Sequence, residues 1–146
     1  MLLWRISPFR NLNGEGGLRF SARWHTAGIP VVYLAESPAG ALLEICANTA
    51  ADDIPSQFTL LKVVGPDVAV EKVALSDLPS GWITGFDVTR RIGMGWLESR
   101  RSALLQVPSA LVPETANFLF NPLHPDAAQF QIERAYEYPF DLRLKS

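Results

Sequence analysis

Short apolar stretches alternate with tight turns along this chain, and this alternation limits the folds that it can adopt. Turn signals such as Gly65-Pro66-Asp67 and Asn121-Pro122 separate the stretches. Because strands outnumber helices and several are joined by tight turns, the sequence predicts an α+β fold rather than a doubly wound one. The expected strands are residues 2–6, 31–35, 57–64, 68–73, 104–107 and 110–112, with a closing strand over 130–138.

Two helices are expected between these strands. Ser37-Pro38 offers an N-cap followed by proline at the first helical position, so a helix should run from there to about Asn48. Asp87 is expected to cap a second helix that carries Val88, Ile92 and Trp96 at steps of four. Residues 7–29 are rich in glycine and are expected to form a long irregular segment, which in a compact domain is usually functional or mobile.

The bulk composition describes a soluble globular chain of one domain. Its 146 residues are 48% hydrophobic and 19% charged, with a formal net charge of −2. The absence of a basic excess argues against direct DNA binding by this chain. The start of the chain does not resemble a signal peptide, and no apolar run is long enough for a membrane span. With a single cysteine, Cys46, the expected location is the cytoplasm.

Four polar side chains stand beside these elements. Arg23 lies in the glycine-rich segment, Tyr33 in an apolar strand, Glu44 in the first helix and Ser109 between two prolines. An arginine, a phenol, one carboxylate and a hydroxyl suit a ligand with phosphates and sugars better than a metal ion. Each of these residues also has an ordinary structural explanation.

Glu44 interrupts an otherwise apolar helical stretch. On a helical wheel its neighbours are the small residues Gly40, Ala41, Ala47 and Asn48. A binding site would use this stripe to bring a ligand close to the helix. The alternative is a solvent-facing surface, which periodicity alone favours.

Arg23 stands next to Trp24. Its planar guanidinium could grip a diphosphate through two hydrogen bonds, which lysine cannot copy. The alternative is a surface arginine stacked on Trp24. Arg5 and Arg19 are further candidates for phosphate binding.

Tyr33 and Ser109 leave similar alternatives open. The Tyr33 ring could stack against a flat cation such as nicotinamide, or it could belong to the core with its hydroxyl satisfied by a neighbour. Ser109 lacks the surroundings of a nucleophile elbow, so a serine hydrolase is not expected. Its hydroxyl could instead hydrogen-bond the backbone of a turn.

The remaining reactive side chains give weaker signals. His25, His124 and Cys46 cannot assemble a usual zinc site without carboxylates at unusual spacings, so no metal is expected. The pairs Arg90-Arg91 and Arg100-Arg101 are expected to be solvated charges at helix ends.

Together, these residues and their surroundings resemble the RES domain, a family named for an arginine, a glutamate and a serine. The segments GEGGLRFSARW, GIPVVYLAESPAGALLE and LLQVPSALVPETANFLFNP carry the resemblance, which runs from about Leu3 to Pro139. Arg23, Tyr33, Glu44 and Ser109 stand at the family's RW, VVY, LLE and VPS positions, and Asn117 begins the family's N-x-x-x-N-P ending. Two departures are His25, where asparagine is common, and Ser21-Ala22 in place of a glycine pair.

The resemblance implies one RES domain over residues 1–146, with a mixed β-sheet core, a few helices and a fold similar to that of ADP-ribosyltransferases. It implies a toxin of a bacterial type II toxin–antitoxin system that arrests growth by consuming NAD⁺ as a substrate, without a separate cofactor. The nicotinamide–ribose bond would be cleaved by water or by phosphate. Mono-ADP-ribosylation of a protein and an inactive module that binds an antitoxin are the alternatives. The implied partner is an Xre-like helix-turn-helix antitoxin in a hetero-oligomeric complex.

The resemblance also suggests a role for each residue. Glu44 would stabilise the oxocarbenium-like ribose electrostatically. Arg23 would hold a phosphate, and Tyr33 would orient the nicotinamide end. Ser109 would hydrogen-bond the nicotinamide ribose or amide, and Asn117 is counted among the binding residues. No metal is needed, because the nicotinamide ring is already cationic in NAD⁺ and leaves as a neutral molecule.

Overall fold

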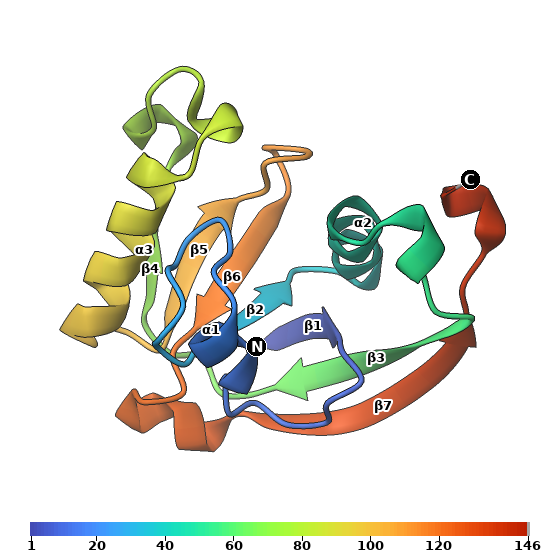
Figure 1. The fold of residues 1–146 in the computed structure, drawn as a ribbon. Helices are drawn as coiled ribbons and strands as arrows, with labels where there is room; N and C mark the ends of the chain where they lie inside the picture. The colour runs from blue at the N-terminus through green and yellow to red at the C-terminus, as the bar shows by residue number, and fades with distance from the viewer. Residues whose placement is uncertain (146) are drawn as a thin grey trace.

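The computed structural model describes residues 1–145 and contains one mixed sheet with the strand order β4-β5-β6-β2-β1-β3-β7 (Figure 1). Only β4 and β5 are parallel; the other neighbouring pairs are antiparallel. Together with three α-helices, this sheet confirms the α+β prediction. The strands are β1 (Leu2–Ile6), β2 (Val32–Ala35), β3 (Gln57–Val64), β4 (Val70–Lys72), β5 (Leu104–Pro108), β6 (Ala116–Phe120) and β7 (Gln131–Pro139).

The helices are α1 (Glu15–Arg19), α2 (Pro38–Asn48) and α3 (Asp87–Ser99). The prediction for α2 is confirmed, and Ser37 Oγ accepts a hydrogen bond from the Gly40 amide at 2.9 Å. The expected cap of α3 is wrong, because Phe86 occupies the N-cap position and Asp87 is the first helical residue. The segment 7–29 is not wholly irregular, since α1 lies within it.

Two strand predictions require correction. Residues 110–112 form bends instead of a strand, because Ser109 Oγ accepts the Leu111 amide at 3.1 Å and turns the chain there. The chain then returns as β6, which the sequence analysis had not assigned to a strand. The strand expected over 68–73 is shorter, because only the residues of β4 pair with β5.

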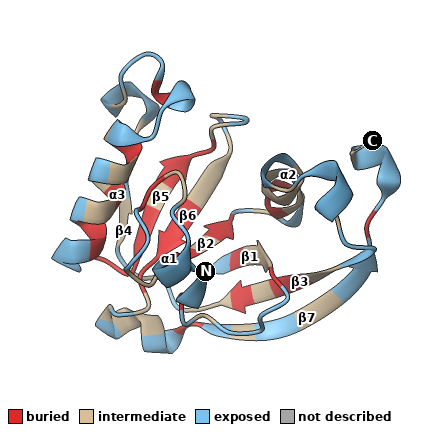
Figure 2. Ribbon diagram, viewed as in Figure 1, coloured by how far each residue is buried: buried red, intermediate tan, exposed pale blue. Residues whose placement is uncertain are grey.

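Alternating side chains give the sheet two apolar faces, each with its own core cluster. On β2, Val32 and Leu34 belong to one cluster, whereas Tyr33 packs against the other, which contains Trp96 of α3. Strand pairing aligns Tyr33 with Leu119 and Ala35 with Asn117 on the adjacent β6, so these four side chains share the second face. Figure 2 shows buried residues concentrated on β5, β6 and β2, while β7 is largely exposed.

Candidate active site

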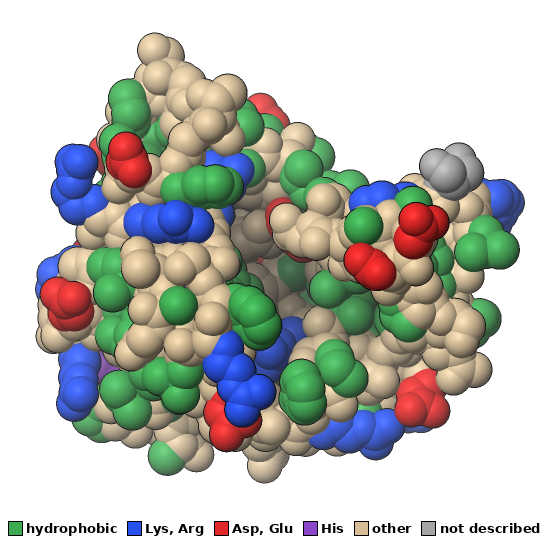
Figure 3. Space-filling model, in the orientation of Figure 1, with side chains coloured by type: hydrophobic (Ala, Val, Ile, Leu, Met, Phe, Trp, Pro, Cys, Tyr) green, Lys and Arg blue, Asp and Glu red, His purple; other side chains and the backbone are tan. Residues whose placement is uncertain are grey.

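A cavity of about 710 Å³ lies on the face of the sheet that carries Tyr33 and Asn117. Its walls come from β1, the segment 16–25, β2, α2, the beginning of α3 and the ends of β5 and β6. Figure 3 shows this face of the molecule hollowed near its centre, with basic side chains in and beside the hollow. The volume lies within the usual range for a small-molecule site.

The Glu44 carboxylate is held in place at the wall of this cavity. Its Oε1 accepts hydrogen bonds from Ser109 Oγ at 2.8 Å and from Asn117 Nδ2 at 2.9 Å. Within residues 1–145, both of the hydrogen bonds that reach this carboxylate go to Oε1 and none goes to Oε2. The carboxylate is therefore oriented while one of its oxygens stays available to a ligand.

The helix that carries Glu44 turns its small residues toward the cavity. Ala41, Ala47 and Asn48 of α2 line the cavity together with Glu44. Most of the stripe of small residues therefore faces the cavity, and Ala47 and Asn48 are also exposed to solvent. Small side chains here let a ligand approach the helix closely.

Ser109 lies behind the carboxylate. It is only 1% exposed. Its hydroxyl oxygen also accepts hydrogen bonds from the backbone amides of Leu111 at 3.1 Å and Val112 at 3.4 Å. The turn interpretation of Ser109 is thus confirmed. Because the single hydroxyl proton of Ser109 is donated to Glu44, the geometry favours a positioning role over direct contact with a ligand.

Tyr33 and His25 form a hydrogen-bonded pair at the cavity wall, in which His25 is buried and Tyr33 is half-buried. The Tyr33 hydroxyl lies 2.8 Å from His25 Nδ1, and His25 Nε2 lies 3.2 Å from the Gly17 carbonyl oxygen. Since a carbonyl can only accept, Nε2 carries the proton and Nδ1 accepts from the phenol. The phenol oxygen in turn accepts the Trp24 amide at 3.3 Å. The hydroxyl is satisfied by neighbours, as the core interpretation expected, while Tyr33 also lines the cavity.

Burial fixes the protonation of this pair. Desolvation lowers the pKa of His25, which is 1% exposed, so its imidazole is neutral at pH 7. Desolvation also raises the pKa of Tyr33, so the phenol stays protonated. The histidine found where the family commonly has asparagine therefore acts as a hydrogen-bonding element of the core.

Arg23 also lines the cavity, and its contacts differ from those that the sequence suggested. Its Nη1 donates to the carbonyl oxygens of Trp82 and Gly85, both at 3.3 Å. Its guanidinium lies 5.8 Å from the centre of the Trp82 ring and 5.0 Å from that of Phe86. The alternative of a surface arginine stacked on Trp24 is wrong, because the guanidinium lies over Trp82 and Phe86 and Trp24 is a 2% exposed core residue. Desolvation lowers the pKa of Arg23, and the charge of Glu44 opposes that shift.

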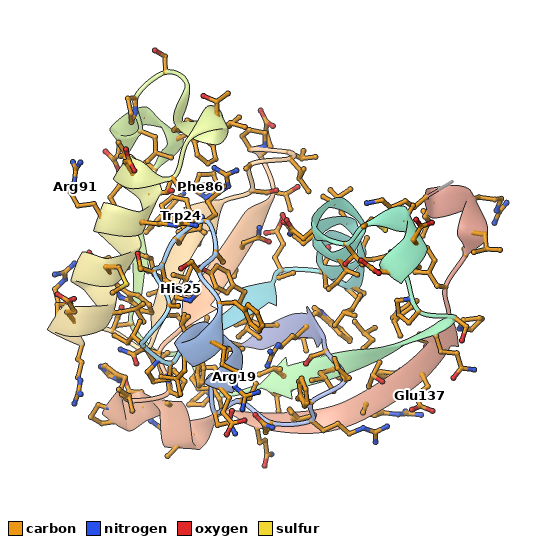
Figure 4. All side chains as sticks on the ribbon, viewed as in Figure 1. Arg19, Trp24, His25, Phe86, Arg91 and Glu137 are labelled. Carbon is orange, nitrogen blue, oxygen red and sulfur yellow. The ribbon has the colours of Figure 1, made fainter. Side chains whose placement is uncertain are left out.

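Two other arginines line the cavity. Arg5 of β1 donates from Nη1 to the Asn11 carbonyl at 3.2 Å, and desolvation lowers its pKa. Arg90 of α3 also lines the cavity, so the expectation of a solvated helix-end charge is wrong for it. That expectation holds for Arg91, which is exposed and points away from the cavity in Figure 4. Arg19 is exposed and does not line the cavity.

Helix α3 supports the short segment that carries Arg23. Thr89 Oγ1 donates to the Arg23 carbonyl at 2.6 Å, and Arg90 Nε donates to the Ala22 carbonyl at 2.8 Å. One turn further along, a Cβ atom on Gly93 would come within 1.7 Å of the Trp24 carbonyl oxygen. Only glycine allows this close approach of the helix to the segment.

The five residues proposed from sequence thus converge from distant parts of the chain. Arg23, Tyr33, Glu44 and Asn117 line the cavity, and Ser109 contacts Glu44 from behind. Within residues 1–145 there is no cluster of three or more His, Cys, Asp or Glu side chains that could hold a metal ion. In the same part of the chain, every helix is too short or too polar to cross a membrane.

Comparisons with known proteins identify relatives along nearly the whole chain. "Toxin Res" of Pseudomonas putida (strain KT2440) is 47% identical over 137 residues, which are 91% of this chain and 94% of that protein. "Prs ADP-ribosylating toxin" of Sphingobium sp. (strain YBL2) is 34% identical over 152 residues, with 97% of this chain and 94% of that protein covered.

A solved structure confirms the fold. A chain of the Mycobacterium tuberculosis MbcT–MbcA toxin–antitoxin complex superposes with a TM-score of 0.78 at 20% identity, covering 94% of this chain and 84% of that one. The sequence pattern of the family described as "RES domain" matches residues 2–141. This chain therefore belongs to the RES domain family, together with relatives that are named as toxins.

Proposed function

We propose that this protein is the toxin of a toxin–antitoxin system and that it depletes NAD⁺ by cleaving the nicotinamide–ribose bond. The observation that carries the proposal is the oriented Glu44 carboxylate, held through Oε1 by Ser109 and Asn117 at the wall of a ligand-sized cavity. Its membership in the RES family and its relatives named as toxins support the biological role.

The chemistry needs one well-placed negative charge. When the bond between ribose C1 and the pyridinium nitrogen breaks, its electron pair goes to the nitrogen and nicotinamide leaves as a neutral molecule. The positive charge moves to the ribose. There the Glu44 carboxylate stabilises it electrostatically and accepts a hydrogen bond from a ribose hydroxyl. Attack by water yields ADP-ribose and a proton, and attack by phosphate yields ADP-ribose 1-phosphate.

Tyr33 and Arg23, which also line the cavity, suit the nicotinamide ring and the phosphates of NAD⁺. The Tyr33 ring lines the cavity while its hydroxyl is engaged elsewhere, so the ring offers a flat surface to the nicotinamide end. Arg23 supplies a guanidinium at the cavity wall for a phosphate. NAD⁺ is the substrate in this scheme, and no separate cofactor takes part in it.

A second candidate function is the transfer of ADP-ribose to a protein. One relative, 34% identical, is named an ADP-ribosylating toxin for Prs, and the same cavity would serve this reaction with a protein nucleophile in place of water. A third candidate is an inactive module that binds an antitoxin. The intact hydrogen bonds around Glu44 argue against inactivity.

Expression in bacteria with measurement of growth and cellular NAD⁺ tests the proposal. Wild type should arrest growth and deplete NAD⁺, whereas Glu44→Gln should lower the rate of NAD⁺ cleavage by about 10²-fold or more, because it removes the charge and keeps the shape. Glu98→Gln, which neutralises an exposed glutamate of α3, is the matched control and should behave as wild type.

Two outcomes would redirect the proposal. Growth arrest with undiminished NAD⁺ and new ADP-ribose adducts in mass spectra would establish the transferase. Full activity of Glu44→Gln would remove the catalytic assignment.

For the partner, we propose an Xre-like helix-turn-helix antitoxin in a hetero-oligomeric complex, since the solved structural neighbour is a toxin–antitoxin complex. Co-expression of such a protein should restore growth and co-purify with this chain.

A further inference from the structure

We propose that Arg90 is a second phosphate-binding residue, which forms with Arg23 an anion subsite for the diphosphate of a dinucleotide. This inference rests on the proposed function and extends it to the recognition of the substrate. It starts from the aromatic ring of Phe86, the N-cap residue of α3. The guanidinium of Arg90 lies 4.5 Å from the centre of that ring, and that of Arg23 lies 5.0 Å from it.

The two guanidinium groups thus share one aromatic ring at the wall of the cavity. Arg23, Phe86 and Arg90 all line it. Figure 4 shows Phe86 directed toward the central hollow from the beginning of α3, near Trp24. Like charges repel, and the charge of Arg90 contributes to lowering the pKa of Arg23. An arrangement of this kind is stabilised when an anion binds between the two cations.

No acidic side chain neutralises this pair. Among residues 1–145, neither guanidinium is within salt-bridge distance of a carboxylate. Glu44 acts on Arg23 only at longer range, and its Oε1 is engaged by Ser109 and Asn117. The positive charge at this wall is therefore available to a ligand.

Arg90 keeps donors free for such a ligand. Its Nε donates to the Ala22 carbonyl at 2.8 Å, which fixes the plane of the guanidinium. Within the described part of the chain, its two terminal nitrogens donate to no acceptor. A guanidinium fixed at Nε presents a fork that can bind phosphate oxygens through two parallel hydrogen bonds.

The support behind the pair is rigid. Thr89 holds the Arg23 carbonyl, and the contact of Gly93 with Trp24 fixes the distance between α3 and the segment. Both cations are thereby placed before a ligand arrives, which reduces the ordering cost of binding. Two cations that share one ring at the cavity suit a ligand with two negative charges, such as a diphosphate.

Isothermal titration with inorganic pyrophosphate tests the subsite directly. Arg90→Gln should weaken pyrophosphate binding by at least about tenfold, the effect of losing a charge-assisted pair of hydrogen bonds. Arg91→Gln removes an exposed arginine at the next position of the same helix, and it should change the affinity by less than about twofold. Arg90→Lys should show an intermediate loss, because it keeps the charge but not the fork.

A kinetic comparison separates ligand binding from a bracing role. Arg90→Gln should raise KM for NAD⁺ at least about tenfold and leave the cleavage of nicotinamide riboside, which has no phosphate, unchanged. If Arg90 acted only by bracing the segment that carries Arg23, Thr89→Val, which removes the neighbouring hydrogen bond to the Arg23 carbonyl and no charge, would raise KM for NAD⁺ as much as Arg90→Gln does, and that result would overturn the inference. Unchanged pyrophosphate affinity in Arg90→Gln would overturn it as well.

The same experiments distinguish this inference from the proposed function. If the wild-type protein consumes no NAD⁺ but binds pyrophosphate, and Arg90→Gln weakens that binding, the function fails and the anion subsite stands. If wild type consumes NAD⁺ and Arg90→Gln binds pyrophosphate as wild type does, the subsite fails and the function stands. Failure of wild type to bind pyrophosphate at all would also refute the subsite.

Discussion

Replacing Ser109 with alanine tests whether catalysis depends on the orientation of the Glu44 carboxylate. Ser109 is buried and does not line the cavity, so its removal takes no direct ligand contact away. The substitution deletes the 2.8 Å hydrogen bond to Glu44 Oε1 and the acceptor of the Leu111 amide. It leaves the charge of Glu44 and the second anchor, Asn117, in place.

The size of the effect follows from these contacts. A hydrogen bond to a charged group contributes about 1.5–3 kcal/mol, which corresponds to about 10- to 150-fold in rate if it is lost in the transition state. Because Asn117 still holds Oε1, we expect the lower end, a decrease of about tenfold in kcat. The lost turn hydrogen bond should lower the free energy of unfolding by about 1 kcal/mol.

The assay compares NAD⁺ cleavage and urea unfolding with a matched control. Ser102 is also a buried serine, and its hydroxyl accepts Trp96 Nε1 at 2.9 Å and donates to the Leu104 carbonyl at 2.8 Å. It does not line the cavity. Ser102→Ala should therefore destabilise the protein by about 1–3 kcal/mol and leave kcat unchanged.

Two results would refute this reasoning. If Ser109→Ala keeps the wild-type kcat while losing stability, the serine serves only the turn, and Glu44 is oriented without it. If Ser102→Ala lowers kcat as much as Ser109→Ala, the loss reflects general destabilisation.

Three further predictions follow from the buried contacts. Because burial depresses the pKa of His25, the unfolded state takes up a proton first as the pH falls below about 6.5, and stability should decline by up to about 1.4 kcal/mol per pH unit. His25→Asn should flatten that slope in urea titrations, and parallel slopes would contradict the assignment. Tyr33→Phe should lower the melting temperature, because Trp24 loses its acceptor, but change KM for NAD⁺ by less than about threefold; a tenfold rise would assign the hydroxyl to the substrate. Gly93→Ala should destabilise the protein by about 3 kcal/mol or more, whereas Gly95→Ala, in open space on the same helix, should be neutral or stabilising by up to about 1 kcal/mol in chemical denaturation.

Local signals explain which elements could be predicted from sequence. The beginning of α2 follows from Ser37 and Pro38, because capping acts within one turn. The stripe around Glu44 was also visible, but which way it faces depends on where the sheet lies. The apolar residues Ala110, Leu111 and Val112 led to a strand being predicted one turn too early, because Leu111 and Val112 lie at the surface in the turn that precedes β6.

Arg90 shows what local reasoning could not recover. Its neighbourhood is polar, so the pattern predicts a solvated charge. Its actual surroundings come from Ala22, 68 residues earlier in the chain, which packs against α3. The one available signal was Gly93, since a glycine inside a helix can mark the close approach of another backbone.

The sequence separation of the groups around the carboxylate also sets when activity can arise during synthesis. Ser109 and Asn117 contact Glu44 across 65 and 73 residues, and both lie on the hairpin formed by β5 and β6. A nascent chain that ends before this hairpin contains the arginine, the tyrosine and the carboxylate, but neither of the groups that orient the carboxylate. Catalytic competence is therefore a late event in the biogenesis of the protein, and a ribosome-bound fragment shorter than about 120 residues contains no complete β6. For a protein proposed to poison the cell that makes it, this order leaves time for a partner to meet the chain before the site is complete.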